Sequence, residues 1–288
     1  MTPEQRKPQK TGGIAPLFRG RALFLLAFAL AACAAACGSG SEQLMARAEA
    51  RWREGNYLEA IQLNRWLYER DPEGSLAPKA LLNIGNIHYR NLRRIKDAVV
   101  AYRKVAEEFP GFPEELEARL QLAAISENEI VDLTEAVNQY DRILERTDLD
   151  DRLEIEFRRA NAYFKMEDYS RALRQLRRME EAGVAGHLAD QICLKIGNIY
   201  QIQRRYEDAK GYFERVEQSP CPECRHRAIT SLAETYESLY DFQKAIETIR
   251  KLDRTPENDR RVAEQEKRLL EKERKMSSGN TGAWPARR

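Results

Sequence analysis

Two cysteines close together in the sequence are the residues best suited to chemistry. Cys221 and Cys224 flank a proline and a glutamate, and His226 follows two residues later. In an oxidising compartment the two cysteines would form a short-range disulfide. Together with His226 they supply three metal ligands, fewer than the four of a structural zinc site. Cys193 does not provide the fourth, because it lies on an apolar helix face and is expected in the core. The sequence favours a disulfide over free thiols, and both over metal or redox work, so no metal ligand is assigned.

The histidines do not indicate an enzyme. His88, His187 and His226 are the chain's three histidines, and none has a serine, a cysteine and an acid at a spacing typical of an activated nucleophile. No glycine-rich phosphate-binding loop occurs in the sequence. We therefore expect no catalytic residue and no small-molecule substrate.

The N-terminal segment is typical of a secretory signal. Residues 1–21 carry five basic side chains and one acid, and the 11-residue apolar run ALFLLAFALAA follows at 22–32. A basic leader before a short apolar run directs export, and this run is too short to span a bilayer comfortably. An uncleaved signal anchor is the alternative.

The end of the apolar run resembles the lipobox of bacterial lipoproteins. Leucine, two alanines and Cys33 occupy residues 30–33, and Cys37 follows three further alanines as a weaker match. The resemblance implies a covalent diacylglycerol and fatty acyl anchor on Cys33 (alternatively Cys37) and no other cofactor. No aspartate follows either cysteine. In lipoproteins of Gram-negative bacteria that absence favours the outer membrane over the inner one, so we expect the remainder of the chain to face the periplasm.

The charge balance gives no indication of a nucleic-acid partner. The whole chain has 48 basic and 46 acidic residues. Removing residues 1–32 takes away five basic residues and one acid, which leaves 43 against 45, a net charge of −2. A mature chain without a basic excess lacks the electrostatic footprint of a nucleic-acid-binding protein.

Six alanines recur along the chain at nearly constant spacing. The spacings are 38, 38, 36, 37 and 36 residues, for Ala60, Ala98, Ala136, Ala172, Ala209 and Ala245. Large apolar residues lie three before and seven after each alanine, and in five of the six segments also four after, with Asn64 as the exception. These offsets place the side chains on one face of a helix. A fixed period of this length is typical of a solenoid.

A second helix is expected before each of these. Residues 84–98 and 196–209 nearly repeat each other, with one residue inserted in the first, and each carries a mid-helix glycine, Gly85 or Gly197. Because glycine weakens a helix, close packing of two helices is the expected reason for it. Beyond residue 40 every proline falls between the expected helix pairs, and no stretch alternates with period two, so we predict no sheet.

The pattern as a whole resembles the tetratricopeptide repeat family. The segments GNYLEA (55–60), MEDYSRA (166–172) and RRYEDA (204–209) are close to that family's turn between helices. Unit three departs from the pattern, with Glu127 in place of the usual tyrosine, and units three and four lack the closing proline. The resemblance implies an all-α, right-handed superhelical solenoid of about six helix–turn–helix units. We place the units at residues 42–75, 76–112, 113–149, 150–185, 186–221 and 222–255.

Three further segments flank the array. Residues 33–41 are expected to be the linker to the lipid, and residues 276–288 a disordered tail. Residues 256–275 form a strongly charged helical pattern with few apolar residues. Such a helix is typical of the polar cap of a solenoid, with a partner-binding helix as the alternative.

The resemblance also implies where a partner would bind. In tetratricopeptide arrays the first helices of successive units line the concave face, and peptide-binding members use asparagine and basic residues there. The matching residues here are Asn86, Arg90, Asn161, Lys165, Asn198 and Gln201. The alternative is that these side chains are solvated or hydrogen-bonded between repeats.

The expected function is that of a non-enzymatic scaffold. The layout resembles outer-membrane tetratricopeptide lipoproteins of β-barrel assembly, of secretin or pilus assembly and of Tol–Pal coordination. Other envelope proteins are the expected partners through the concave face, and the membrane through the lipid. An accessory subunit of an envelope enzyme or thiol-redox system, using Cys221 and Cys224, is the alternative.

Overall fold

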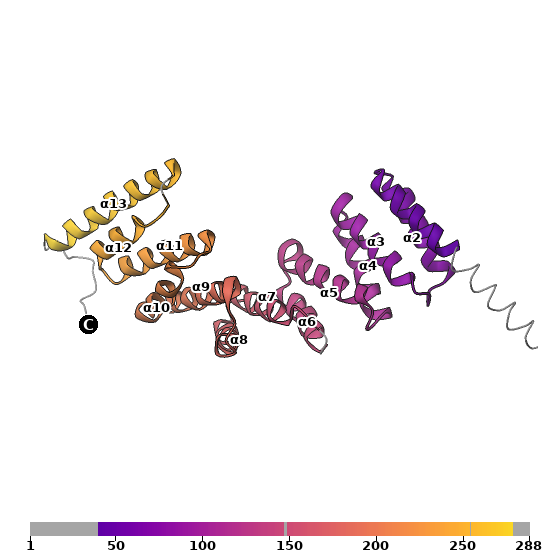
Figure 1. Ribbon diagram of the computed structural model, residues 1–288, viewed down its shortest axis with the longest axis horizontal. Coiled ribbons are helices and arrows are strands. Elements are labelled where there is room, and N and C mark those ends of the chain that lie inside the picture. Colours follow the sequence, from indigo (N-terminus) through magenta and orange to yellow (C-terminus); the bar gives the residue numbers. More distant parts are fainter. Residues whose placement is uncertain (1–39, 147–148, 254, 279–288) are drawn as a thin grey trace, which may run out of the picture. The chain divides into compact units, whose positions relative to one another are not determined.

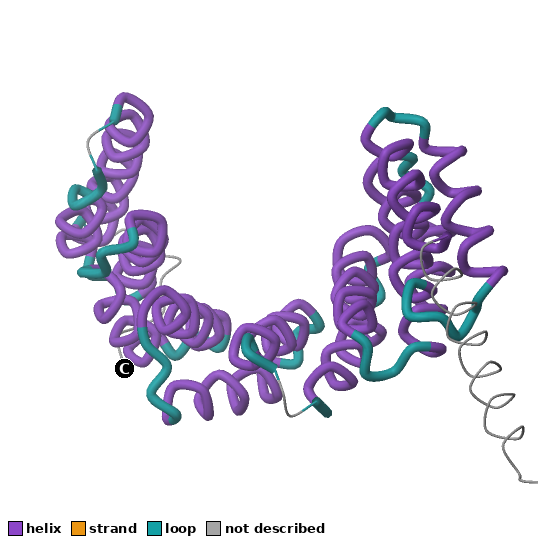
Figure 2. Tube along the Cα trace, turned by 45° about the vertical axis from the view of Figure 1, so that its right-hand side comes forward, coloured by secondary structure: helices purple, strands orange, loops and turns teal. Residues whose placement is uncertain are grey.

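The computed structural model describes residues 40–146, 149–253 and 255–278, and these residues form helices and connecting loops without a strand (Figure 2). The chain divides into two compact units, residues 1–118 and 119–288, with the division inside one helix. Cys33, Cys37, the signal segment and most of the predicted tail lie outside the described residues.

The first unit contains helix pairs joined by short turns (Figure 1). Residues 40–53 are helical and precede α2 (Tyr57–Arg70). The next pair is α3 (Ala77–Asn86), continued by the π-helical turn η1 (Ile87–Asn91), and α4 (Ile95–Glu108). Helix α5 (Pro113–Ile125) then crosses into the second unit. Helix α3 packs against both α2 and α4, which is the nearest-neighbour stacking of a solenoid.

The second unit continues the alternation. A π-helical turn, η2 (Ser126–Ile130), ends the helix begun by α5, and the helices that follow pack each against the next. They are α6 (Leu133–Leu144), α7 (Arg152–Lys165), α8 (Tyr169–Glu181), α9 (Gly186–Ile202), α10 (Tyr206–Glu217), α11 (Pro222–Ser238), α12 (Phe242–Ile249) and α13 (Pro256–Ser277). The first helices of successive repeats also meet, because α7 contacts α9 and α9 contacts α11.

The six recurring alanines lie in the packed interior of their repeats. All six are fully buried, and each second helix begins at the large apolar residue three places earlier. The residues seven places after each alanine are buried as well. Asn64, the polar exception, is also buried: its amide donates to the Ala60 carbonyl at 2.8 Å, and its Oδ1 accepts from Asn83 at 3.4 Å. The periodic pattern therefore predicted the core correctly.

An aromatic ring of the second helix packs against each of the two mid-helix glycines. A Cβ added at Gly85 would lie 2.6 Å from the Tyr102 ring, and one added at Gly197 would lie 2.6 Å from the Phe213 ring. Both rings are fully buried. Close packing is therefore the reason for glycine at these positions, as the sequence predicted.

The longer spacings of 38 residues coincide with the two π-helical turns. Both occur at the end of a first helix, η1 in repeat two and η2 in repeat three, and a π turn accommodates one extra residue in a helix. This accounts for the residue inserted in 84–98 relative to 196–209. The second helix consequently starts in the same register in every repeat.

The turns between the paired helices share a left-handed residue. In each repeat the residue five places before the alanine has a positive φ, and only the first of them is glycine. A left-handed residue ends a helix by satisfying its last carbonyl groups. The residues and their φ angles are Gly55 (82°), Arg93 (54°), Val131 (60°), Glu167 (61°), Arg204 (59°) and Tyr240 (61°).

The charged C-terminal helix covers the end of the array. Leu269 of α13 is buried against Phe242, Ala245 and Ile246 of α12. On the same helix Arg268 and Lys272 form ion pairs of 2.6 and 2.5 Å with Glu237 of α11. The helix ends at Ser277, two residues beyond the predicted end. These contacts are those of a cap, because a few apolar side chains, including Val262 and Met276, pack against the array while most of the helix is charged.

We expect Gly197→Ala to destabilise the second unit by about 1–3 kcal/mol. The new methyl group overlaps the buried Phe213 ring, and this overpacking outweighs the gain in helix propensity of up to about 1 kcal/mol. Urea denaturation followed by circular dichroism measures the change. Gly211→Ala is the matched control, since Gly211 lies in α10 and a Cβ there meets nothing within 4 Å. A Gly197→Ala protein as stable as Gly211→Ala would contradict the packing argument.

Candidate functional site

The first helices α7, α9 and α11 form the face on which most of the predicted binding residues lie. Asn161 of α7 and Asn198 of α9 occupy equivalent positions, each next to the buried small residue of its helix, Ala160 or Gly197. Both asparagines are half-buried. An amide at such a position can donate to and accept from the backbone of an extended peptide.

A lysine that lies between these asparagines in the sequence has a lowered pKa. Lys195 of α9 is half-buried, and its Nζ lies 4.3 Å from the centre of the Phe164 ring. Burial first, and the positive charges of Arg227 and Lys165 next, together lower the pKa of Lys195 from 10.5 to about 8. The face therefore holds a cation that an incoming carboxylate would stabilise.

The neighbouring Lys165 is already paired. Its Nζ lies 2.7 Å from Glu127 Oε2, whose side chain is only 8% exposed. Glu127 also accepts a 2.6 Å hydrogen bond from the hydroxyl of Tyr140, a residue whose pKa is raised by burial first and by this bond second. The glutamate that departs from the family's tyrosine thus links two repeats. The sequence showed the departure but not its partners.

We call this group of residues the first-helix strip. It combines amides for backbone hydrogen bonds, an aromatic ring and cationic groups, which together suit an extended acidic segment. Its members are Asn161, Phe164 and Lys165 of α7, Lys195 and Asn198 of α9, and Arg227 of α11. Sequence reasoning did not single out Arg227, which lies one repeat beyond the predicted residues.

The other predicted binding residues have different surroundings. Gln201 is half-buried near the end of α9, and Arg90 is exposed in η1 of the first unit. Asn86 lies in the interior of the first unit, not on an exposed face. Asn86 is 6% exposed, accepts a 2.8 Å hydrogen bond from the Tyr102 hydroxyl and donates to Glu117 Oε1 at 3.4 Å. Its amide joins helices instead of facing a partner, the alternative that the sequence had left open.

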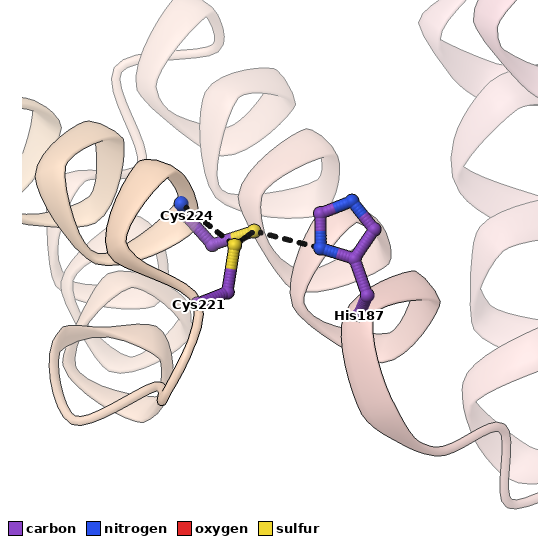
Figure 3. A group of neighbouring side chains, drawn as sticks. All are labelled: His187, Cys221 and Cys224. Atoms are coloured by element: carbon purple, nitrogen blue, oxygen red, sulfur yellow. Dashed lines mark hydrogen bonds between the residues drawn. The ribbon is translucent and has the colours of Figure 1, made fainter.

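The two cysteines of the Cys-Pro-Glu-Cys segment lie at the start of α11. The structure has both as free thiols, so the disulfide favoured by the sequence is not formed in it. Their Sγ atoms are 2.8 Å apart, and Cys221, the N-cap residue, accepts the Cys224 N–H at 3.2 Å. The histidine beside them is His187 of α9, whose Nδ1 lies 3.3 Å from Cys224 Sγ (Figure 3). Cys193 is buried in the core, as expected.

The first unit has a separate hollow of about 400 Å³ beside α2, α3 and α4. His88 lines it with its Nδ1 buried, without a hydrogen bond and 3.9 Å from Asp97. At that separation the contact is a weak electrostatic one, and burial lowers the pKa of His88. The other lining residues include both cations and acids, such as Arg65, Glu69 and Lys104, so the hollow has no preference for one ligand charge.

Comparison with known proteins identifies the repeats. Models of the tetratricopeptide repeat match residues 45–113 and 190–218. Both segments are similar to that repeat. The prediction of an all-α tetratricopeptide solenoid is therefore confirmed. This fold is in general a scaffold for binding other proteins without catalysis.

Solved structures agree on the fold. A tetratricopeptide repeat protein from Parabacteroides merdae is 17% identical, with a TM-score of 0.56 over 84% of this chain and 94% of its own. The C-terminal part of a repeat protein from Cytophaga hutchinsonii is 15% identical, with a TM-score of 0.54 over 72% and 77%. PilW, a type IV pilus biogenesis factor, is 14% identical, with a TM-score of 0.52 over 80% and 98%. Identities this low show the fold alone.

Two further findings complete the comparison. No protein of curated function matches the sequence. Within the described residues, no helix combines the length and apolar character needed to cross a lipid bilayer.

We expect Lys195→Met to stabilise the protein at pH 7 by about 1 kcal/mol, because it removes a partly desolvated cation while keeping contact with Phe164. Since the folded-state pKa of Lys195 is lowered to about 8 from 10.5, the unfolded chain binds more protons between these values. The stability of the wild type therefore rises through that window, and the difference between the two proteins shrinks.

Urea denaturation at intervals from pH 7 to about 10 measures this difference. Lys210→Met is the control, because Glu207 raises the pKa of Lys210 instead of lowering it. A stability difference between Lys195→Met and wild type that stays constant with pH would contradict the assignment.

Proposed function

We propose that this protein is a lipid-anchored scaffold of the bacterial envelope that binds an extended, acidic segment of a protein partner through the first-helix strip. The strip is the observation that carries the proposal. The strip brings cations together: Arg227 lies close enough to Lys195 for its charge to lower the pKa of that lysine, and Lys165 adds to this effect although it is paired with Glu127. Local complementarity of this kind governs orientation and association rate more than bulk charge does.

The strip also suits a peptide for a physical reason beyond charge. Asn161 and Asn198 are one repeat apart on neighbouring helices, so their amides can bond to successive parts of one extended backbone. The helices beneath them are held by the buried core of the second unit. A preformed surface loses little conformational entropy when a partner docks.

The proposed anchor follows from the lipobox-like sequence before the array. A diacylglycerol on Cys33, with Cys37 as the alternative, would hold the repeats at the outer membrane on its periplasmic side. Two or more acyl chains bind a bilayer stably, since each buried methylene contributes about 0.8 kcal/mol. A tethered scaffold of this kind fits the assembly or organisation of an envelope complex, such as a β-barrel assembly machine, a secretin or pilus, or a Tol–Pal-like system.

The alternative function is an accessory role in an envelope enzyme or thiol-redox system, based on Cys221 and Cys224. Their sulfur atoms are adjacent, which favours it. His187 beside Cys224 is not needed by a simple dithiol exchange, however, and the first-helix strip has no part in it. The scaffold explains more of the residues that the structure brings together.

Cys33→Ala should abolish lipid labelling and membrane retention of the mature chain. The substitution removes the thiol that receives the diacylglycerol, so the protein should be released or remain as an unprocessed precursor. Metabolic labelling with a fatty acid, followed by membrane fractionation, measures both. Cys37→Ala is the control and should behave like the wild type. If Cys37→Ala alone abolishes labelling, Cys37 is the modified residue. Labelling of both variants would contradict lipidation at a single one of these cysteines.

Substitution of the strip should weaken partner binding about 5- to 150-fold. The double change Asn161→Ala with Asn198→Ala removes two backbone-pairing amides, each worth roughly 0.5–1.5 kcal/mol. Crosslinking in intact cells and purification of the full-length protein should recover a β-barrel protein, a secretin or a peptidoglycan-linked protein, and this recovery should fall in the double variant. Lys195→Met should weaken binding too, whereas Lys210→Met on the second helix α10 should not. Equal recovery with all variants would rule out the strip as the binding face.

A further inference from the structure

Three metal-binding side chains meet between α9 and α11, and their assembly goes beyond the proposed scaffold function. His187 is the second residue of α9, Cys221 is the N-cap of α11, and Cys224 lies in the first turn of α11. The imidazole faces the two sulfur atoms (Figure 3), and all three ligand atoms lie within 4.8 Å of one another. We propose that these residues bind one zinc ion, with the fourth coordination position open to water.

The chemistry of the three groups selects a thiophilic metal. Two thiolates and an imidazole suit zinc, whereas calcium and magnesium require oxygen ligands. Asp190 on α9, a carboxylate whose charge acts on Cys224, already accepts a 2.5 Å hydrogen bond from the hydroxyl of Ser219. The site is thus a Cys₂His set with three protein ligands, the number typical of zinc sites that keep an open position.

The spacing of the ligand atoms fits zinc after a small adjustment. Tetrahedral bonds of about 2.3 Å to sulfur and 2.0–2.1 Å to nitrogen place ligand atoms about 3.5–3.8 Å apart. The Cys224 Sγ to His187 Nδ1 distance is already 3.3 Å, and the two sulfurs would separate by about 1 Å from their present 2.8 Å. Cys221 and His187 are not buried, so they are free to rotate, whereas Cys224 is fixed in the core at 1% exposure.

The groups around the ligands support this assignment. The backbone N–H of Cys224 donates to Cys221 Sγ, and a donated N–H stabilises a thiolate. On the other side, the Gln191 amide lies 2.7 Å from His187 Nε2. The oxygen and nitrogen of an amide can be exchanged by rotating the group. With its oxygen toward His187, the glutamine would accept a hydrogen bond from Nε2–H, and the lone pair on Nδ1 would be available to the metal.

The site is built by the repeat itself. His187 and Cys224 are 37 residues apart, close to one repeat length, and both lie in the first turn of a first helix, in repeats five and six. A zinc ion held by both would link the first helices of repeats five and six at their N-terminal ends. The expected consequence is added stability of this junction, because an ion that binds only the folded chain stabilises it.

The test uses the full mature chain in detergent, reduced under anaerobic conditions and freed of metal. Zinc is titrated against a chelator of known affinity, and cobalt is used as a spectroscopic probe for thiolate coordination in a four-coordinate site. Cys221→Ser, Cys224→Ser and His187→Ala remove one ligand each. His226→Ala and Cys193→Ser are the matched controls, because neither residue belongs to the cluster.

We expect one zinc ion per wild-type chain, a thiolate-to-cobalt absorption band and a higher melting temperature with zinc. Each ligand substitution should weaken zinc binding at least tenfold and remove the rise in melting temperature, and both controls should match the wild type. Circular dichroism of each variant without metal verifies folding. Absence of zinc binding by the reduced chain, or equal weakening by His226→Ala and His187→Ala, would overturn the proposal, as would isolation of the native protein wholly as a Cys221–Cys224 disulfide. None of these outcomes bears on partner binding by the first-helix strip.

Discussion

The close approach of the two helices in each repeat is the constraint on which the rest of this structure depends. The second helix of each repeat carries a fully buried alanine, and the first helix carries a buried alanine or glycine. Where glycine occurs, at Gly85 and Gly197, the space of its missing Cβ is taken by an aromatic ring. Because protein interiors are densely packed, a methyl group added at such a point is not absorbed locally. The helix spacing, and hence the positions of all exposed side chains, follow from these contacts.

This constraint determines what can vary along the chain. Repeats two and three each have an extra residue, and both accommodate it in a π-helical turn at the end of the first helix, away from the buried alanine. The following turn then adopts a left-handed residue in every repeat, even where that residue is Val131, for which a positive φ is costly. The packed helices on both sides impose this conformation. The strain at this turn is offset by the packing of the second helix, which therefore keeps its register.

The sequence was sufficient for the fold because the fold is periodic, and insufficient for the site because the site is not. The offsets of three, four and seven around each alanine predicted the helices and the core. Side-chain partners depend on which neighbouring groups lie within hydrogen-bonding distance, and the sequence pattern does not give these distances. Asn86 forms hydrogen bonds with Tyr102 and Glu117, and Lys165 with Glu127. The histidine beside the cysteines is His187, not the nearby His226. A usable signal was present, since Lys165 and Glu127 are 38 residues apart and His187 and Cys224 are 37 apart.

A separation of about one repeat length indicates how a solenoid of this kind forms a site. Within one repeat the side chains that face the paired helix are buried in the core. The groups left for chemistry therefore lie where the first helices of successive repeats meet, and their neighbours come from about one period away. The Lys165–Glu127 pair, the asparagines of the first-helix strip and the Cys₂His cluster all follow this rule. A consequence is that binding and stacking use the same junctions. A ligand held between α7 and α9, or an ion held between α9 and α11, must also tighten the contact between those repeats, because it binds only when both are in register.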